Sequence, residues 1–187
     1  MKPGGAYTDL HRALSTTCSD NSAVNFFNRG IGRIIDEEVT ISIAAGTHTI
    51  NVFKVTGTIW LFEQWAELTE ITTLTNFTNM YSTLYDGTNT RIVTADGATL
   101  SGLPVGTVFT KAQDETQPYT VVDASGCQIT VPLDAKKVGY PFTLTQKSGT
   151  DTYLQLHMTT TDDPVSFKMR LLFTWAPLNG GNFELLI

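Results

Sequence analysis

The sequence predicts an all-β fold: a single β-sandwich or jelly-roll, or a barrel-like domain, preceded by an N-terminal arm. Three observations predict this class. About 30 of the 187 residues are threonine, and β-branched threonine fits a half-buried pleated surface better than a helix. Short stretches of alternating apolar and polar residues recur along the chain, with turn residues between them. Helical periodicity is almost absent.

The chain divides into an N-terminal arm, residues 1–35, and one all-β domain, residues 36–187. Within the arm, residues 7–14 suit one or two helical turns, and residues 24–27 (VNFF) place two aromatic rings beside asparagine, arginine and glycine. Two interpretations stay open. The segment either packs on its own domain or docks on a neighbouring subunit.

The first strands are predicted between residues 39 and 72. Residues 39–43 alternate strictly, with apolar side chains at the odd positions, and residues 47–55 alternate again. Gly57 is expected to interrupt the second strand. The run 58–72 breaks alternation, since Trp60, Phe62 and Gln64 share one predicted face while Ile59, Leu61 and Trp65 do not fit. A bulge or a change of sheet explains this break, and a helix over 63–70 is the competing interpretation.

The second half of the chain continues the β pattern. Asp86-Gly87, between the β-forming segments 77–85 and 90–94, predicts a hairpin because glycine supplies the positive φ of a tight turn. Residues 102–106 form a loop before a short strand at 107–111. Further strands are expected at 119–123, 128–131, 152–161 and 165–175, with a turn at 162–164 and a tail at 183–187. About a dozen short strands indicate a sandwich, jelly roll or barrel.

Composition excludes some classes of function. The net charge is −6, from 12 basic and 18 acidic residues, and the basic residues are scattered, so a nucleic-acid partner is not expected. No apolar run has the length needed to cross a bilayer, and the N-terminus lacks the apolar core of a signal peptide. Cys18 and Cys127 form no CxxC motif and are interpreted as two free thiols, with a disulfide left open.

No catalytic, cofactor or metal site is predicted. His11, His48 and His157 have no neighbouring ligand at metal-binding spacing, so each is interpreted as structural. The sequence has no nucleophile elbow, HExxH, Walker A or dinucleotide-binding motif. Its adjacent acids at 36–38, 114–115 and 162–163 suit solvated loops, with a weak calcium site at 162–163 as the alternative.

Aromatic residues raise one further possibility. Trp60, Trp65 and Trp175 accompany ten Phe and six Tyr. On a sheet these side chains usually fill the core, but a Trp or Tyr exposed beside polar groups would indicate carbohydrate binding.

Several segments resemble small β-rich virion proteins of tailed phages. The segment 46–57 (GTHTINVFKVTG) precedes a long apolar strand, and it is similar to the phenylalanine-and-glycine strand of that class. Asp86-Gly87-Thr88 resembles its middle turn, and the segment 105–109 (VGTVF) its following strand. The segment 167–178 (FKMRLLFTWAPL) is similar to its closing strand. The longer N-terminus and the Trp-rich stretch 59–65 depart from the pattern.

The resemblance spans about residues 45–178 and implies a capsid cement, or decoration, protein. Such a protein is non-enzymatic, forms a homotrimer and binds the major capsid protein or other virion proteins. It lies on the capsid surface of the virion after synthesis in the host cytoplasm, with no membrane or nucleic-acid partner. The expected contact residues are Phe26, Phe27 and Arg29 in the arm and Leu103, Pro104 and Val105 in the loop. A tail, baseplate or fibre component and a carbohydrate-binding β-sandwich are the alternatives.

Overall fold

The structure, a computed structural model, describes residues 33–71, 76–111, 118–122, 142–163 and 165–187. All of the regular secondary structure in these ranges is β-strand, which confirms the predicted all-β class. The nine strands are β1 (Arg33–Ile43), β2 (Gly46–Ile71), β3 (Phe77–Tyr85), β4 (Thr90–Ala98), β5 (Val108–Lys111), β6 (Tyr119–Val122), β7 (Phe142–Thr145), β8 (Thr152–Thr160) and β9 (Val165–Leu185).

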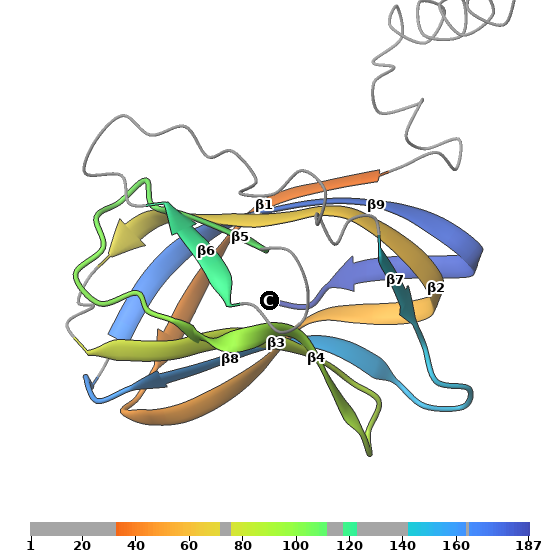
Figure 1. Cartoon of the computed structure of the whole chain (residues 1–187), viewed down its shortest axis with the longest axis horizontal. Coiled ribbons are helices and arrows are strands. Elements are labelled where there is room, and N and C mark those ends of the chain that lie inside the picture. The colour runs from red at the N-terminus through yellow and green to blue at the C-terminus, as the bar shows by residue number, and fades with distance from the viewer. Residues whose placement is uncertain (1–32, 72–75, 112–117, 123–141, 164) are drawn as a thin grey trace, which may run out of the picture.

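The strands form one antiparallel sheet that curls into a nearly closed barrel (Figure 1). The order is β1-β9-β2-β8-β3-β4, with β5 and β7 also paired to β2 and β6 paired to β5. Between β5 and β4, the Nζ of Lys111 donates a hydrogen bond of 2.7 Å to the carbonyl of Val93. This bond helps to bring the β5–β6 side of the sheet against β4.

A long ribbon of two strands connects the two layers of the barrel. β2 and β9 pair from Phe53 opposite Leu185 to Ile71 opposite Phe167. The first half of β2 also pairs with β8, and its second half pairs with β7 and β5. Both strands therefore bend and belong to both layers. Residues 46–56 and 58–71 form one strand, so the prediction that Gly57 interrupts it is wrong: Gly57 lies at a register shift and supplies the positive φ of 59° found there.

The alternation read in the first strand is confirmed. Val39 and Ile41 are buried, and Ile43 packs against the core at its edge. In the next strand Val52 and Phe53 are both buried although they are adjacent. A register shift between Asn51 and Phe53 against β8 explains this, because a bulge adds one residue and turns the following side chains to the other face.

The Trp-rich run 58–71 is strand, and the helical alternative is wrong. The bulge predicted there is confirmed by the register shift between Leu61 and Glu63. Because of that extra residue, Gln64 does not share the face of Trp60 and Phe62. Gln64 turns inward and is 5% exposed, whereas Trp60 is 42% exposed.

The hairpin predicted at Asp86-Gly87 joins β3 to β4. The carboxylate of Asp86 accepts hydrogen bonds from the backbone N–H groups of Asn89 at 2.7 Å and Thr88 at 3.0 Å. These bonds, together with the Asn89 side chain and the nearby Lys147, lower the pKa of Asp86 to about 2. The turn residues thus stabilise the ionised form of the side chain that caps them.

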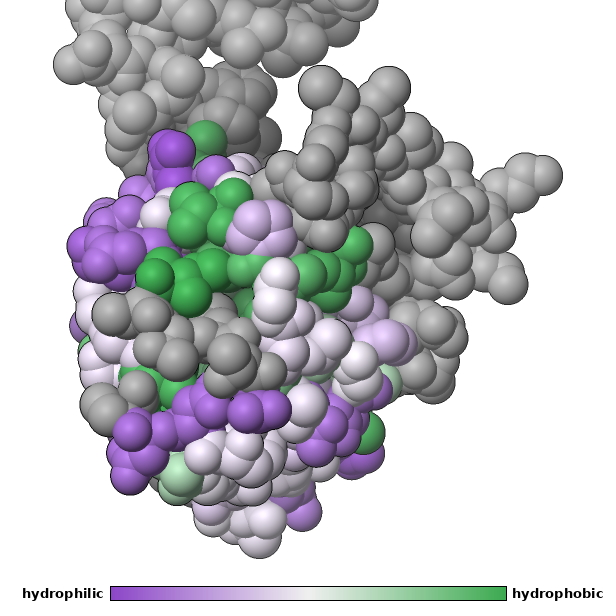
Figure 2. Space-filling model, turned by 90° about the vertical axis from the view of Figure 1, so that its left-hand side faces the viewer, coloured by the Kyte–Doolittle hydropathy of each residue, from purple (hydrophilic) through white to green (hydrophobic). Residues whose placement is uncertain are grey.

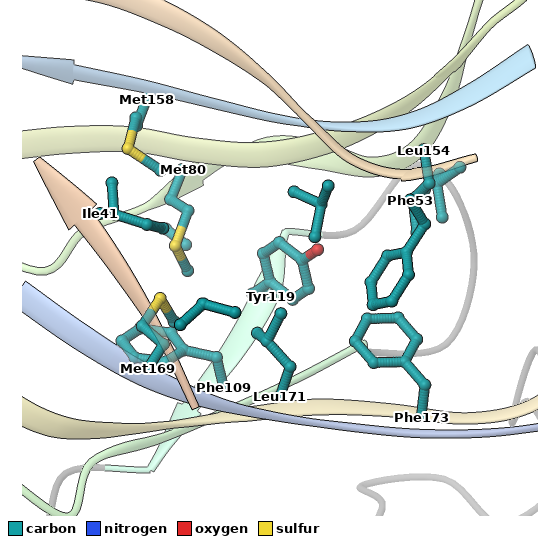
Figure 3. Close-up of a cluster of buried hydrophobic side chains, with 14 of the residues drawn as sticks. Ile41, Phe53, Met80, Phe109, Tyr119, Leu154, Met158, Met169, Leu171 and Phe173 are labelled. Atoms are coloured by element: carbon teal, nitrogen blue, oxygen red, sulfur yellow. The ribbon is translucent and has the colours of Figure 1, made fainter. Parts of the chain in front are cut away.

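The core lies between the layers and is rich in aromatic and methionine side chains (Figure 3). Phe53 stacks on Phe183 with ring centroids 4.2 Å apart and meets Phe173 at 4.6 Å. These contacts join both halves of the β2–β9 ribbon from the inside. The strand expected at 128–131 and both cysteines lie outside the described residues, whereas the strand at 119–123 is found as β6.

Candidate interaction surfaces

The interior of the barrel leaves little room for a ligand. A cavity of about 40 Å³ lies between the layers, and Gln64, Ser82 and Tyr119 are among its lining residues. This volume suits a few water-sized molecules and is far below the several hundred Å³ of a typical small-molecule site. The outer surface is therefore the candidate for binding a partner.

A buried polar network lies beside this cavity. Gln64 Nε2 donates a hydrogen bond of 2.7 Å to the hydroxyl of Tyr119, which also bonds to Ser82 and Thr94. Burial raises the pKa of Tyr119, so its hydroxyl keeps its proton. No group in the described part of the chain donates to Oε1 of Gln64. The network joins β6 to β2, β3 and β4.

The predicted contact loop lies between β4 and β5. Leu103 packs against the core, and the carbonyl of Pro104 accepts hydrogen bonds from the N–H and hydroxyl of Thr107 at 3.2 and 2.7 Å. Val105 is 53% exposed. The loop is at the end of the barrel seen in Figure 2, where hydrophobic side chains gather between hydrophilic ones. Of the three predicted residues, Val105 is thus the one held mostly in solvent.

The three arm residues predicted to make contacts, Phe26, Phe27 and Arg29, lie outside the described residues. β1 begins at Arg33, whose guanidinium lies 5.0 Å from the ring centroid of Trp175. The first strand is therefore fixed to the barrel from its first residue.

A second apolar surface was not predicted. Trp60 points outward from β2, and the ring of Phe62 meets it edge-on with centroids 6.0 Å apart. Trp60 lies opposite Ala176 of β9, and Ile34 lies opposite Thr174, two residues earlier on the same strand. Side chains two apart on a strand share a face. Ile34, 53% exposed, therefore belongs to the same outer surface. We call Ile34, Trp60 and Phe62 the outer apolar strip; Thr174 and the buried Ala176 are the β9 residues opposite Ile34 and Trp60.

The sequence contained a signal for this strip. Ile59 and Leu61 are fully buried, and strict alternation puts Trp60 on the opposite face. Strict alternation places Phe62 beside Trp60 as well, and the extra residue of the bulge after Leu61 then turns Gln64 to the inner face. The bulge was predicted, but its effect on the two faces was not.

Charged residues continue the same face beyond the strip. Arg170 of β9 makes two hydrogen bonds of 2.6 and 2.7 Å to the carboxylate of Asp36 in β1. This bidentate contact lowers the pKa of Asp36. Lys168 pairs with Glu70 at 2.5 Å. Opposite charges are thus placed side by side across the three strands β1, β9 and β2.

The opposite layer carries an uncharged polar face. The two ring nitrogens of His157 bond to the hydroxyls of Thr49 at 3.0 Å and Thr83 at 2.7 Å. The ring of Tyr81 stacks on His157 with centroids 4.4 Å apart. Partial burial lowers the pKa of His157. His157 thus joins β2, β8 and β3 on the outside of the barrel, in the structural role predicted for it.

His48 is also held by its own fold, because its Nε2 donates a hydrogen bond of 2.8 Å to the carbonyl of Ala44. In the described part of the chain, no three His, Cys, Asp or Glu side chains lie close enough to hold a metal ion. Asp162 accepts hydrogen bonds from the backbone and side chain of Asn76. In the same ranges, no helix has the length and apolar character to cross a membrane.

Comparison with known proteins gives a partial likeness. No family model matches the chain, and no curated protein matches it. Among solved structures, that of the Gx strain of infectious bursal disease virus aligns over 83% of this chain and 37% of the viral one, with 12% identity and a TM-score of 0.35. A subviral particle of VP2 from the same virus aligns over 83% and 42%, with 16% identity and a TM-score of 0.25. The chain thus spans about two fifths of these viral chains.

Proposed function

We propose that this protein is a structural module of a virus particle, and more specifically a cement protein that binds a capsid shell and stabilises it as an oligomer. The observation that carries the proposal is the outer apolar strip. A Trp–Phe pair stands on a central strand of the nearly closed barrel, and nearly half of the Trp60 surface faces solvent. Exposed aromatic side chains on rigid strands are typical of protein–protein contact sites.

The arrangement of the fold also supports an assembly role. The core is packed with large side chains, and the interior cavity is small. On the described outer surface, the ion pairs and the hydrogen-bonded hydroxyl groups lie on regular strands. Such a module presents a fixed surface to a partner, and several weak contacts repeated in an oligomer add up to firm attachment. The resemblance of residues 45–178 to tailed-phage virion proteins supports the shell as the partner.

The test is co-sedimentation of the purified protein with empty capsid shells, with the molar mass of the free protein measured by light scattering. Saturable binding by a trimer is expected. Trp60→Ala should weaken binding about tenfold or more, as the loss of a buried aromatic anchor does. Ile92→Ala is the matched control, since Ile92 is 56% exposed on β4, away from the strip. Deleting residues 1–30 tests the proposed docking of the arm and should also weaken binding.

Failure to bind shells would overturn the cement role. An oligomer that binds tails instead would favour a tail, baseplate or fibre component. Equal effects of the Trp60 and Ile92 substitutions would show that the strip is not the contact surface.

One observation favours a second candidate, the binding of a neutral carbohydrate. Tyr81 stacks on His157, whose ring bonds to the hydroxyls of Thr49 and Thr83, so an aromatic ring and polar groups stand together on this face, as sugar binding needs. Both hydroxyls already form a hydrogen bond with His157, so they have fewer donor and acceptor positions left for a sugar. A monomer that binds neutral oligosaccharides, and loses them in a Tyr81→Ala variant, would support this candidate.

A further inference from the structure

β1 has one edge that the described strands leave open. It pairs along its full length, Arg33 to Ile43, with β9 on one side only. In a strand of 11 residues, about half of the backbone N–H and C=O groups point away from the partner strand. Such an edge can accept another strand.

The side chains of β1 limit which strand can add there. Asp36, Glu37 and Glu38 follow one another in its middle, and all three are exposed. Asp36 is paired with Arg170, and Glu38 lies opposite Arg170 and interacts electrostatically with it and with Lys168 without forming an ion pair. The described residues give Glu37 no ion pair. Glu37 also occupies an inward position, between Ile35 and Val39, which both pack on the core. An inward charge on an edge strand opposes pairing with a like strand.

A second copy of β1 is therefore a poor partner. Antiparallel addition of the same strand centred on Glu37 would place acids opposite acids, which destabilises the pair. Glu67, beside Arg170 on β2, adds a further negative charge to the same face, where Glu70 is paired with Lys168. A strand that carries lysine or arginine would instead neutralise this edge while it completes the backbone hydrogen bonds.

We propose that the edge of β1 left open by the described strands receives an extended basic segment of another protein as an additional antiparallel strand. This inference rests on the proposed assembly role, and it names the chemistry of the partner: a segment with two consecutive basic residues and apolar residues on either side of them. Glu37 and Glu38 lie on opposite faces of β1, so each of the two basic side chains meets one acid, and one apolar side chain of the segment lies beside Ile34 at the end of the outer apolar strip.

The experiment uses the full chain and a synthetic peptide of about eight residues, a common strand length, with two consecutive lysines at its centre and valines on either side. A second peptide has the same charge, but two valines are replaced by proline, which cannot complete a strand ladder. We expect the first peptide to bind and to slow amide hydrogen exchange in residues 33–43. The proline peptide should leave that exchange unchanged.

Substitutions assign the effect to the two acids. Glu37→Gln with Glu38→Gln should weaken peptide binding about fivefold, as the loss of two exposed charge pairs does. Asp96→Asn, on the exposed face of the other edge strand, β4, is the matched control and should change nothing. Both variants conserve shape, so their folding is checked by unchanged thermal unfolding.

Three results would overturn the inference: protection, before peptide is added, of the β1 amides that point away from β9, equal binding of the proline peptide, or equal binding by the Glu37/Glu38 variant. The shell experiment separates the two proposals. A protein that binds shells but not the peptide retains the assembly role without the β1 partner. Peptide binding without shell binding would leave the edge site and remove the cement role.

Discussion

At the residue scale, the outer face of β8 depends on a histidine that is neutral. Both nitrogens of His157 bond to threonine hydroxyls, and partial burial lowers its pKa below the usual 6.5. A hydroxyl can donate to one nitrogen and accept from the other, so the neutral ring satisfies both contacts. Protonation keeps the ring in place but charges a site that is partly removed from water.

This arrangement predicts a dependence of stability on pH. Because the folded-state pKa lies below that of the unfolded chain, the contribution of His157 is complete above about pH 6.5 and is lost as the pH falls through the folded-state pKa. His157→Gln retains the hydrogen-bonding capacity but does not titrate. Its midpoint of thermal unfolding should therefore fall less than that of the unaltered protein between pH 7 and pH 5. An equal decrease in the midpoint of thermal unfolding for the two proteins between pH 7 and pH 5 would contradict the prediction.

At the scale of the element, the bend of the β2–β9 ribbon requires glycine. Gly181 lies against β2 so closely that an added Cβ would overlap the carbonyl oxygen of Thr58 and come within 2.9 Å of Ile59 Cγ2. Its neighbour Gly180 has a φ of 73° with open space around it. The two positions therefore exclude side chains for different reasons, the first by contact and the second by backbone conformation.

The pair gives a matched test of this distinction. Gly180→Ala should lower the free energy of unfolding by about 1 kcal/mol, the cost of a left-handed conformation for alanine. Gly181→Ala should cost about 3 kcal/mol or more, because two backbones must separate in the middle of the ribbon. Chemical denaturation of both variants checks the order. A smaller loss of unfolding free energy for Gly181→Ala than for Gly180→Ala would show that the strands separate easily at the bend.

At the scale of the whole molecule, the buried network around Tyr119 holds the barrel closed. β5 and β6 attach to β2 through only three paired residues, 65 to 67. The hydroxyl of Tyr119 adds bonds from β6 to Gln64 of β2 and to Ser82 and Thr94 on the facing layer. Removing that hydroxyl leaves the buried Nε2 of Gln64 without its acceptor, while Ser82 and Thr94 keep their hydrogen bonds to each other.

Tyr119→Phe should accordingly destabilise the protein by about 1–3 kcal/mol. Amide hydrogen exchange should accelerate in β5 and β6 and stay slow in the β2–β9 ribbon, since local opening occurs where few contacts hold a segment. Tyr153→Phe is the control, because its hydroxyl bonds to Asp151 on the surface. Acceleration throughout the molecule would mean that the network stabilises the whole barrel rather than its closure.

Local patterns predicted much of this molecule. Alternation located β1, the Asp-Gly pair located the β3–β4 hairpin, and the broken alternation near Phe62 located a bulge. The pairing of β9 between β1 and β2 had no local signal, because residues more than a hundred positions apart form it. The outer apolar strip went unpredicted for the same reason, because it brings side chains of β1 and β2 together across β9.

The place of β9 has a consequence for how the chain reaches its folded form. β1 and β2 leave the ribosome early, yet the strand that separates them is the last of those described, and β2 and β9 share most of their lengths. Loops of such length close slowly, so folding is expected to be slow for a domain of this size. During synthesis β1 and β2 therefore have unpaired edges and exposed apolar faces, which favour aggregation. We therefore expect the acidic side chains of β1 to repel other nascent chains until β9 has been synthesised and pairs with β1.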